Sequence, residues 1–264
     1  MPRVPGILQT EGAKKRRYYE LAENHQYVEA EKVWHRLHEG KYIGDIVYGA
    51  NDGIVTTFAV VAGAAGAALS PGIVLILGIA NLVADGFSMG ASSFLSLVSE
   101  RNFARKQRER EEWEVKHFPE IEREEVRTIL RKWGVPKDHV EPSVAAITRD
   151  KKRWVGLMMR EELGLKDMEK GSELQHGVVT SVAFLTAGFL PLIPYVFLQL
   201  GEARFLWAAV FSAAAFFLVG AARTLVTVGN PLRAGLEILF VGGLAAGVAY
   251  AIGFFLKAIF NIAI

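Results

Sequence analysis

The chain of 264 residues is 51% hydrophobic, and its 30 basic and 28 acidic residues are spread unevenly along it. It contains no cysteine, which excludes disulfide bonds and thiolate metal sites. The formal net charge is only +2, and no basic stripe is interleaved with aromatic residues, so composition gives no support to nucleic-acid binding.

The N-terminal segment, residues 1–41, is polar, and the apolar run after it begins too late for a cleaved signal peptide. Residues 18–42 are expected to form one amphipathic helix on the cytoplasmic side of a membrane. His35 and His38 are three residues apart and could share a metal ion, although surface histidines explain this spacing better.

Uncharged stretches that reach or approach the length of about 20 residues needed to cross a bilayer are 53–84, 174–201, 205–222 and 238–256. Ser70-Pro71-Gly72 divides the first stretch, because proline and glycine together interrupt helices. Five spanning helices are therefore expected, at about 44–68, 72–97, 175–199, 204–223 and 233–258. The sequence predicts an all-α, multi-pass membrane protein, with helices 1–2 in residues 42–98 and helices 3–5 in residues 173–264.

Basic residues orient these helices, because positively charged loops remain on the cytoplasmic side. Eight of the 30 Lys and Arg residues lie in residues 1–41 and eighteen in residues 99–172, whereas the opposite side holds only Arg204 and Lys257. The N-terminus and residues 99–172 are therefore expected in the cytoplasm, and the C-terminus on the other side.

Residues 99–172 are expected to fold as a cytoplasmic helical domain rather than to form a linker. Strong helix formers fill residues 101–118, so this helix should continue directly from the second span. Breaks are expected at Pro119, Gly134, Pro136 and Pro142, which leave a helix over 120–134 and one or two helices over 142–165.

Seven residues of this domain carry carboxylate or thioether groups at helical spacing: Glu111, Glu114, Glu122, Glu125, Met158, Met159 and Glu162. Each pair of glutamates three residues apart shares a helix face and could bind a cation, and the last helix could add a soft ligand. Glutamate and arginine alternate here, however, so spacing alone favours a solvated charged surface over a metal site.

Ionisable side chains inside apolar spans are costly and usually functional, which singles out Asp52 in the first span and Asp85 in the second. Asn81 and Met89 lie four residues before and after Asp85, so the three share one helix face. Their oxygens suit divalent ions, and the thioether shifts the preference toward softer transition metals. A carboxylate in a low-dielectric path also takes up a proton readily, so it can exchange a proton for a metal ion, as a cation/proton antiporter requires.

Other features of the spans are expected to be structural: the interfacial acids Asp45 and Glu237, the GxxxG pairs Gly86/Gly90 and Gly243/Gly247, and the prolines Pro191 and Pro194. Interfacial placement costs a carboxylate little, GxxxG spacing lets helices approach closely, and proline kinks a helix.

Five stretches resemble the vacuolar iron transporter family: "GANDGIVTTFAVVAGAAGAAL", "ANLVADGFSMGASSFLS", "MMREELGL", "GFLPLIPY" and "LEILFVGGLAAGVAYAIG". The resemblance covers residues 42–258 and implies a homodimeric transporter, not an enzyme, that moves ferrous iron and often manganese out of the cytosol in exchange for protons. It implies that Asp52 and Met89 line the ion path, and that the glutamates and methionines of residues 99–172 bind the metal. No permanently bound cofactor is expected, and the membrane would be the cell membrane of a prokaryote or a vacuolar-type membrane of a eukaryote.

This chain departs from the family pattern at one position, and its loop glutamates can be matched to that pattern in more than one register. Plant-type members carry a glutamate where this chain has Asn81, so Asp85, one turn further on, is the residue expected to take its role. Glu109, Glu112 and Glu161 offer other registers for the loop ligands.

Two other functions remain as alternatives. Glu114-x-x-His117 and Glu173-x-x-His176 have the spacing of di-iron carboxylate proteins, which would fit an iron-oxidising or iron-storage-like membrane protein. The second alternative is a membrane scaffold or sensor that transports nothing and recruits a partner through residues 99–172.

Overall fold

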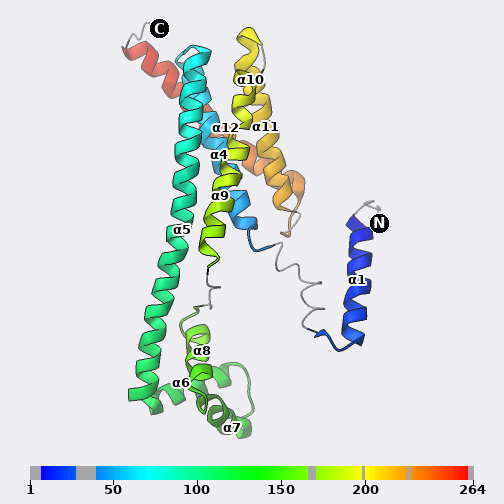
Figure 1. Ribbon diagram of the computed structural model, residues 1–264, viewed down its shortest axis with the longest axis vertical. Coiled ribbons are helices and arrows are strands. Elements are labelled where there is room, and N and C mark those ends of the chain that lie inside the picture. Colours follow the sequence, from blue (N-terminus) through cyan, green and yellow to red (C-terminus); the bar gives the residue numbers. More distant parts are fainter. Residues whose placement is uncertain (1–6, 28–39, 166–170, 198–199, 225–226, 261–264) are drawn as a thin grey trace. The chain divides into compact units, whose positions relative to one another are not determined.

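The computed structural model describes residues 7–27, 40–165, 171–197, 200–224 and 227–260. These residues form helices joined by turns and short 3-10 segments (Figure 1), which confirms the expected all-α class. The chain divides into a membrane unit, Met1–Ala91 with His176–Ile264, and a loop unit, Ser92–Gln175.

Five segments of the described chain are helical, long and apolar enough to cross a membrane, which confirms the predicted number of spans. They are α4 (Ile43–Gly66), α5 (Pro71–His117), α9 and α10 together (Glu173–Val196), η2 with α11 (Gly201–Arg223) and α12 (Pro231–Phe260). Pro71 starts α5, so the predicted break falls between the first two spans, because proline is tolerated in the first turn of a helix and not inside it.

The third span is interrupted at its prolines, as predicted. α9 (Glu173–Gly188) is followed by the 3-10 segment η1 (Leu190–Leu192) and the short helix α10 (Ile193–Val196). Pro191 and Pro194 have no N–H group to donate to the preceding turn, and each lies in the first turn of its short segment, η1 or α10.

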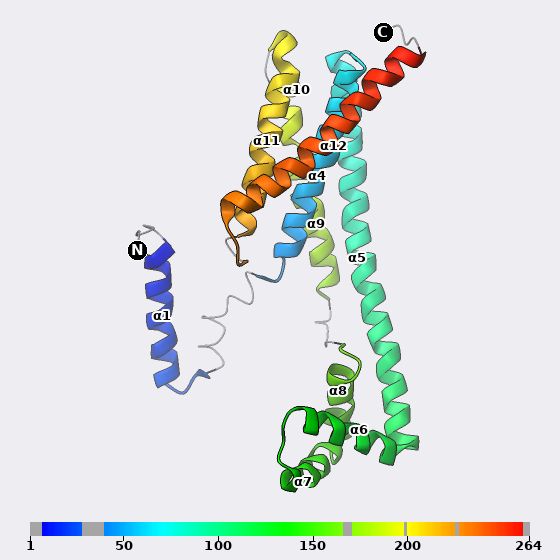
Figure 2. The ribbon, with the colours of Figure 1, turned by 180° about the vertical axis from the view of Figure 1, so that it is seen from behind.

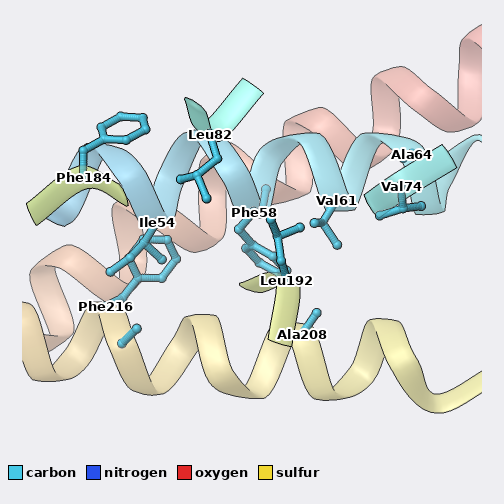
Figure 3. Close-up of a cluster of buried hydrophobic side chains, with 13 residues drawn as sticks. Ile54, Phe58, Val61, Ala64, Val74, Leu82, Phe184, Leu192, Ala208 and Phe216 are labelled. Carbon is cyan, nitrogen blue, oxygen red and sulfur yellow. The ribbon is translucent and has the colours of Figure 1, made fainter. Parts of the chain in front are cut away.

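Helix α4 packs against α9, α11 (Arg204–Arg223) and α12 (Figures 1 and 2). Its glycines permit very close contacts: a Cβ added to Gly53 would lie 2.4 Å from the carbonyl oxygen of Phe184, and one added to Gly253 of α12 would lie 2.0 Å from that of Gly63. Ile54 and Phe58 of α4 contribute to the apolar core between these helices (Figure 3).

The two GxxxG pairs have different outcomes. The α5 pair makes a close helix contact, because a Cβ on Gly90 would lie 2.8 Å from the Gly177 carbonyl oxygen of α9. A Cβ on Gly243 or Gly247 would meet nothing within 4 Å, so the α12 pair makes no close contact within the described chain, and a contact between two subunits stays a prediction. Both glycines lie on the exposed face of α12, and Gly253 makes its close contact with α4 instead.

The loop unit begins as the unbroken continuation of α5 to His117, as predicted. Three shorter helices follow: α6 (Pro119–Lys132), α7 (Lys137–Thr148) and α8 (Lys151–Glu161). Their apolar faces form a small core that includes Val126, Val155 and Met158. The Asp150 side chain caps α8 by accepting hydrogen bonds from the backbone N–H groups of Lys152 and Arg153 at 2.9 and 3.3 Å.

Two predicted boundaries are wrong. Pro142 does not break the chain but lies inside α7, where it removes one backbone hydrogen bond while the buried Val140 and Val144 hold the helix against the core. The N-terminal helix is α1 (Ile7–Glu23), not residues 18–42, and a turn follows it in which His25 has φ +59. His35 and His38 lie outside the described residues.

Candidate functional site

Asp52 and Asp85 bring two carboxyl groups together inside the membrane unit. Asp52 lies between two and three turns into α4, Asp85 lies in the spanning part of α5, and both are partly buried. They are close enough for their negative charges to repel each other. Like charges at this depth are costly unless a proton or a cation joins them, so the pair suits exchange between the two.

Asn81, Asp85 and Met89 form a polar stripe on α5. All three are partly buried, whereas Leu82 and Gly86 beside them are fully buried. The Nδ2 atom of Asn81 is buried without a hydrogen-bond partner in the described part of the chain, and Met89 packs against the edge of the apolar core. The stripe therefore runs along the boundary between the buried and the exposed face of α5.

Two polar residues of α4 were not singled out by their sequence pattern. The Oδ1 atom of Asn51, which precedes Asp52, and the Oγ1 atom of Thr57 are both buried without a hydrogen-bond partner among the described residues. Asn51 belongs to the quoted "NDG" stretch, but a single carboxamide or hydroxyl has no spacing that distinguishes it from packing.

The two interfacial acids have different surroundings. Glu237 lies 3.5 Å from Arg223 and 3.3 Å from Arg233, which fits the expected structural role. Asp45 contacts the imidazole of His176 at 2.6 Å. No sequence spacing indicates this second contact, because the two residues are 131 positions apart.

Five glutamates of the loop unit form one electrostatic group, here called the acidic cluster: Glu111, Glu114, Glu122, Glu125 and Glu162. Glu111 and Glu122 are the most buried, with 4% and 5% of their surface exposed, whereas Glu162 at the end of α8 is exposed. Among the described residues, none of the five forms an ion pair with a basic side chain.

Burial and mutual repulsion raise the pKa of four members of the cluster, Glu111, Glu122, Glu125 and Glu162. Burial first, and then the charges of other cluster members, raise the pKa of Glu111 and of Glu122 to about 7. The pKa values of Glu125 and Glu162 are also raised, again by burial first and by neighbouring carboxylates second. Near pH 7, Glu111 and Glu122 are therefore protonated part of the time, and a bound cation can displace these protons.

The glutamates of the alternative register have different surroundings from those of the acidic cluster. Glu161 pairs with Arg160 at 2.8 Å, Glu109 is exposed, and Glu112 lies beside Arg108 and two lysines. The structure therefore brings together the register that contains Glu111 and Glu122, and not the register that contains Glu109, Glu112 and Glu161.

Met158 and Met159 lie in the apolar core of the loop unit, with 0% and 4% of their surface exposed. Packing accounts for both side chains as they stand, because methionine fills irregular gaps in cores. A role for either sulfur as a metal ligand stays a prediction.

The acidic cluster fits a divalent cation in its chemistry but is not a preformed cage. No three His, Asp or Glu side chains among the described residues are arranged so that they could hold one metal ion. One carboxylate oxygen each of Glu111 and Glu122 is nevertheless buried without a hydrogen-bond partner in the same residues. Oxygen donors of this kind suit hard divalent ions.

In the two Glu-x-x-His sequences that match the spacing of di-iron proteins, the side chains contact residues other than each other. The His117 ring stacks on Trp113 with centroids 4.4 Å apart, and its Nδ1 atom lies 2.7 Å from the Trp113 carbonyl oxygen. Glu173 is buried and ion-paired with Arg101. The geometry therefore gives the iron-oxidising alternative no support.

Comparison with known proteins extends this description. The profile of the VIT family matches residues 43–254. The chain is similar to Vacuolar iron transporter 1 of Arabidopsis thaliana (33% identity over 213 residues, 81% of this chain and 85% of the relative). It is also similar to Vacuolar iron transporter of Toxoplasma gondii (35% over 251 residues, 92% and 81%) and of Plasmodium falciparum (31% over 221 residues, 80% and 81%). With five spans and this match over most of its length, the chain is an integral multi-pass membrane protein that belongs to the VIT family.

Proposed function

We propose that this protein transports ferrous iron, with manganese as a second cargo, out of the cytosol in exchange for protons. The observation that carries the proposal is the pair of partly buried, mutually repelling carboxyl groups of Asp52 and Asp85 inside an apolar bundle. The names of the relatives, which are called vacuolar iron transporters, support iron as the cargo.

In the proposed exchange, the Asp52–Asp85 pair holds a proton while no metal ion is near and releases it when a divalent cation arrives. Repulsion between the two ionised carboxylates destabilises the empty pair, so both the protonated state and the metal-bound state are favoured over it. The carboxamide of Asn81 and the thioether of Met89 lie on the same face as Asp85 and would contact the same ion. A thioether favours ferrous iron over calcium and magnesium, which prefer ligand sets made only of oxygen.

We assign to the loop unit the role of a cytoplasmic metal-binding domain that delivers the ion to the spans. Its acidic cluster offers five carboxyl groups without ion-pair partners in the described chain, and the buried oxygens of Glu111 and Glu122 lack hydrogen bonds. A divalent cation would satisfy these oxygens and cancel the repulsion within the cluster. Met158 and Met159 remain proposed as softer ligands that become available when the core around them rearranges.

A homodimer is proposed because the polar stripe of α5 borders an exposed apolar face. Val83 and Phe87 on this face have 58% and 76% of their surface exposed. A second copy packed beside the stripe would enclose the path between the first two spans of both subunits.

The proposal is tested by metal uptake into proteoliposomes with the variant Asp52→Asn, which keeps the side-chain size and removes the charge. We expect the variant to lose ferrous iron flux while its size-exclusion profile stays the same. Asp138→Asn is the matched control, because Asp138 is an exposed residue of α7 with 78% of its side chain accessible, and it should transport normally.

The same uptake assay distinguishes the proposed transport from the alternative functions. A scaffold or sensor predicts no flux in the wild type, or flux that Asp52→Asn leaves unchanged. Uptake of calcium or magnesium as fast as iron would contradict the role given to Met89. The membrane is expected to be the cell membrane of a prokaryote or a vacuolar-type membrane of a eukaryote.

A further inference from the structure

Asp45 and His176 form a contact between two spans that the proposed exchange does not yet use. Asp45 lies in the first turn of α4 and His176 in the first turn of α9. The Nδ1 atom of His176 lies 2.6 Å from Oδ2 of Asp45, and each side chain is only 17% exposed. The contact therefore lies at the predicted cytoplasmic end of the membrane unit and is largely shielded from solvent.

The surroundings hold this pair in one geometry. The Thr180 hydroxyl lies 3.4 Å from the other carboxylate oxygen of Asp45 and 2.9 Å from the His176 carbonyl oxygen. The Tyr42 ring lies against the imidazole, with centroids 4.7 Å apart. A Cβ added to Gly49 would lie 2.4 Å from the Thr180 carbonyl oxygen, so α4 and α9 cannot separate without losing this contact.

Two charged residues close in sequence to members of this contact are themselves engaged elsewhere. Lys41 lies over the Tyr42 ring, 5.4 Å from its centroid. Glu173, one turn before His176 on α9, is ion-paired with Arg101. Chains of acidic and histidine side chains serve as proton relays in membrane transporters.

Asp45 also lies on the same face of α4 as Asp52. The two residues are seven positions apart, which corresponds to about two turns and roughly 10 Å along the helix axis. Asp45 is therefore the next carboxyl group of α4 between Asp52 and the predicted cytosol. Two groups alone make a poor metal site, and no third His, Asp or Glu joins them among the described residues to hold an ion.

We propose that the His176–Asp45 pair is the station at which transported protons leave for the cytosol, an inference that rests on the proposed proton exchange. A proton released by the Asp52–Asp85 pair when metal binds reaches His176 through water. It binds at Nε2, while Nδ1–H donates to Asp45. The resulting imidazolium is stabilised by the Asp45 carboxylate and then returns to neutral imidazole by giving one proton to cytosolic water, so no charge accumulates in the bundle.

The test uses the full-length protein in proteoliposomes, with a metal-sensitive dye and a pH-sensitive dye recording both fluxes. His176→Gln keeps a hydrogen-bonding side chain but cannot titrate. We expect its proton-coupled iron flux to fall by roughly tenfold or more and to depend less steeply on pH than that of the wild type. His139→Gln is the control, because His139 is an exposed histidine of α7 with 68% of its side chain accessible, and its profile should match the wild type.

The variant Asp45→Asn gives a second reading if His176→Gln folds poorly, because asparagine keeps a polar partner for the imidazole but removes the charge. It should lower the proton-coupled iron flux and weaken its pH dependence. If either folded variant keeps the wild-type rate and the wild-type pH profile, the inference is wrong. A wild type that moves no metal, or moves metal without protons, overturns the proposed function instead, so the two failures are distinguishable.

Discussion

At the scale of single residues, the chemistry of this protein depends on carboxyl groups that are held apart from basic partners. Glu111 and Glu122 have pKa values raised to about 7 by burial and by neighbouring carboxylates. In the unfolded chain the same groups have pKa values near 4.5. The folded, metal-free state therefore binds more protons than the unfolded state between these two values.

This difference predicts that the metal-free protein loses stability as the pH rises from about 5 to about 8. Stability from a raised pKa is fully present below the unfolded value and is lost as the pH passes the folded value. Glu111→Gln removes the ionisation, so it should raise the melting temperature of the loop unit at pH 8 by a few degrees, which corresponds to about 1 kcal/mol, and change it little at pH 5.

Thermal melting of the metal-free protein in detergent, followed by the tryptophan signal of the loop unit, measures this effect. Glu161→Gln is the matched control, because Glu161 is ion-paired with Arg160 and lies outside the acidic cluster. Equal shifts for Glu111→Gln at both pH values would show that the cluster does not repel as described.

At the scale of helices, close packing of α4 against its neighbours depends on glycines at particular registers. α12 offers a matched pair of substitutions. Gly253→Ala would put a Cβ 2.0 Å from the Gly63 carbonyl oxygen, whereas Gly243→Ala would meet nothing within 4 Å. We expect Gly253→Ala to destabilise the protein by roughly 2 kcal/mol, as overpacking does, and Gly243→Ala to have no effect or a slightly stabilising one.

Heat-induced aggregation of the two variants, followed by fluorescence-detected size exclusion, compares them directly. Identical melting temperatures would contradict the described α4–α12 contact. A loss of stability restricted to Gly243→Ala would instead indicate that the exposed face of α12 packs tightly against another molecule.

The number of helices that span the membrane, and the residues that share a helix face, follow largely from the local sequence pattern. Uncharged length indicated the five spans, and the i, i+4 spacing placed Asn81, Asp85 and Met89 on one face. Pro142 was misread because burial of neighbouring valines outweighs one lost hydrogen bond. The Asp45–His176 contact could not be predicted, since spacing within a helix carries no information about which residues of two distant helices meet.

At the scale of the whole molecule, the proposed path is completed by a second copy against α5. The chain contains no cysteine, so single cysteines report on contacts without a background. Ser88→Cys lies on the exposed face of α5 beside Met89 and should form a disulfide-linked dimer on mild oxidation in membranes. Leu244→Cys, on the exposed face of α12, is the control and should stay monomeric on non-reducing gels. Cross-linking at Leu244 alone would place the dimer contact elsewhere.

The coupling of metal movement to proton movement is the central claim, and simultaneous recording of both fluxes in proteoliposomes tests it most directly. With ferrous iron at equal concentration on both sides, an imposed pH gradient should drive net iron movement against the direction of proton flow, and Asp52→Asn should abolish both fluxes. Iron movement at an unchanged rate without a pH gradient and without proton counterflow would contradict the account.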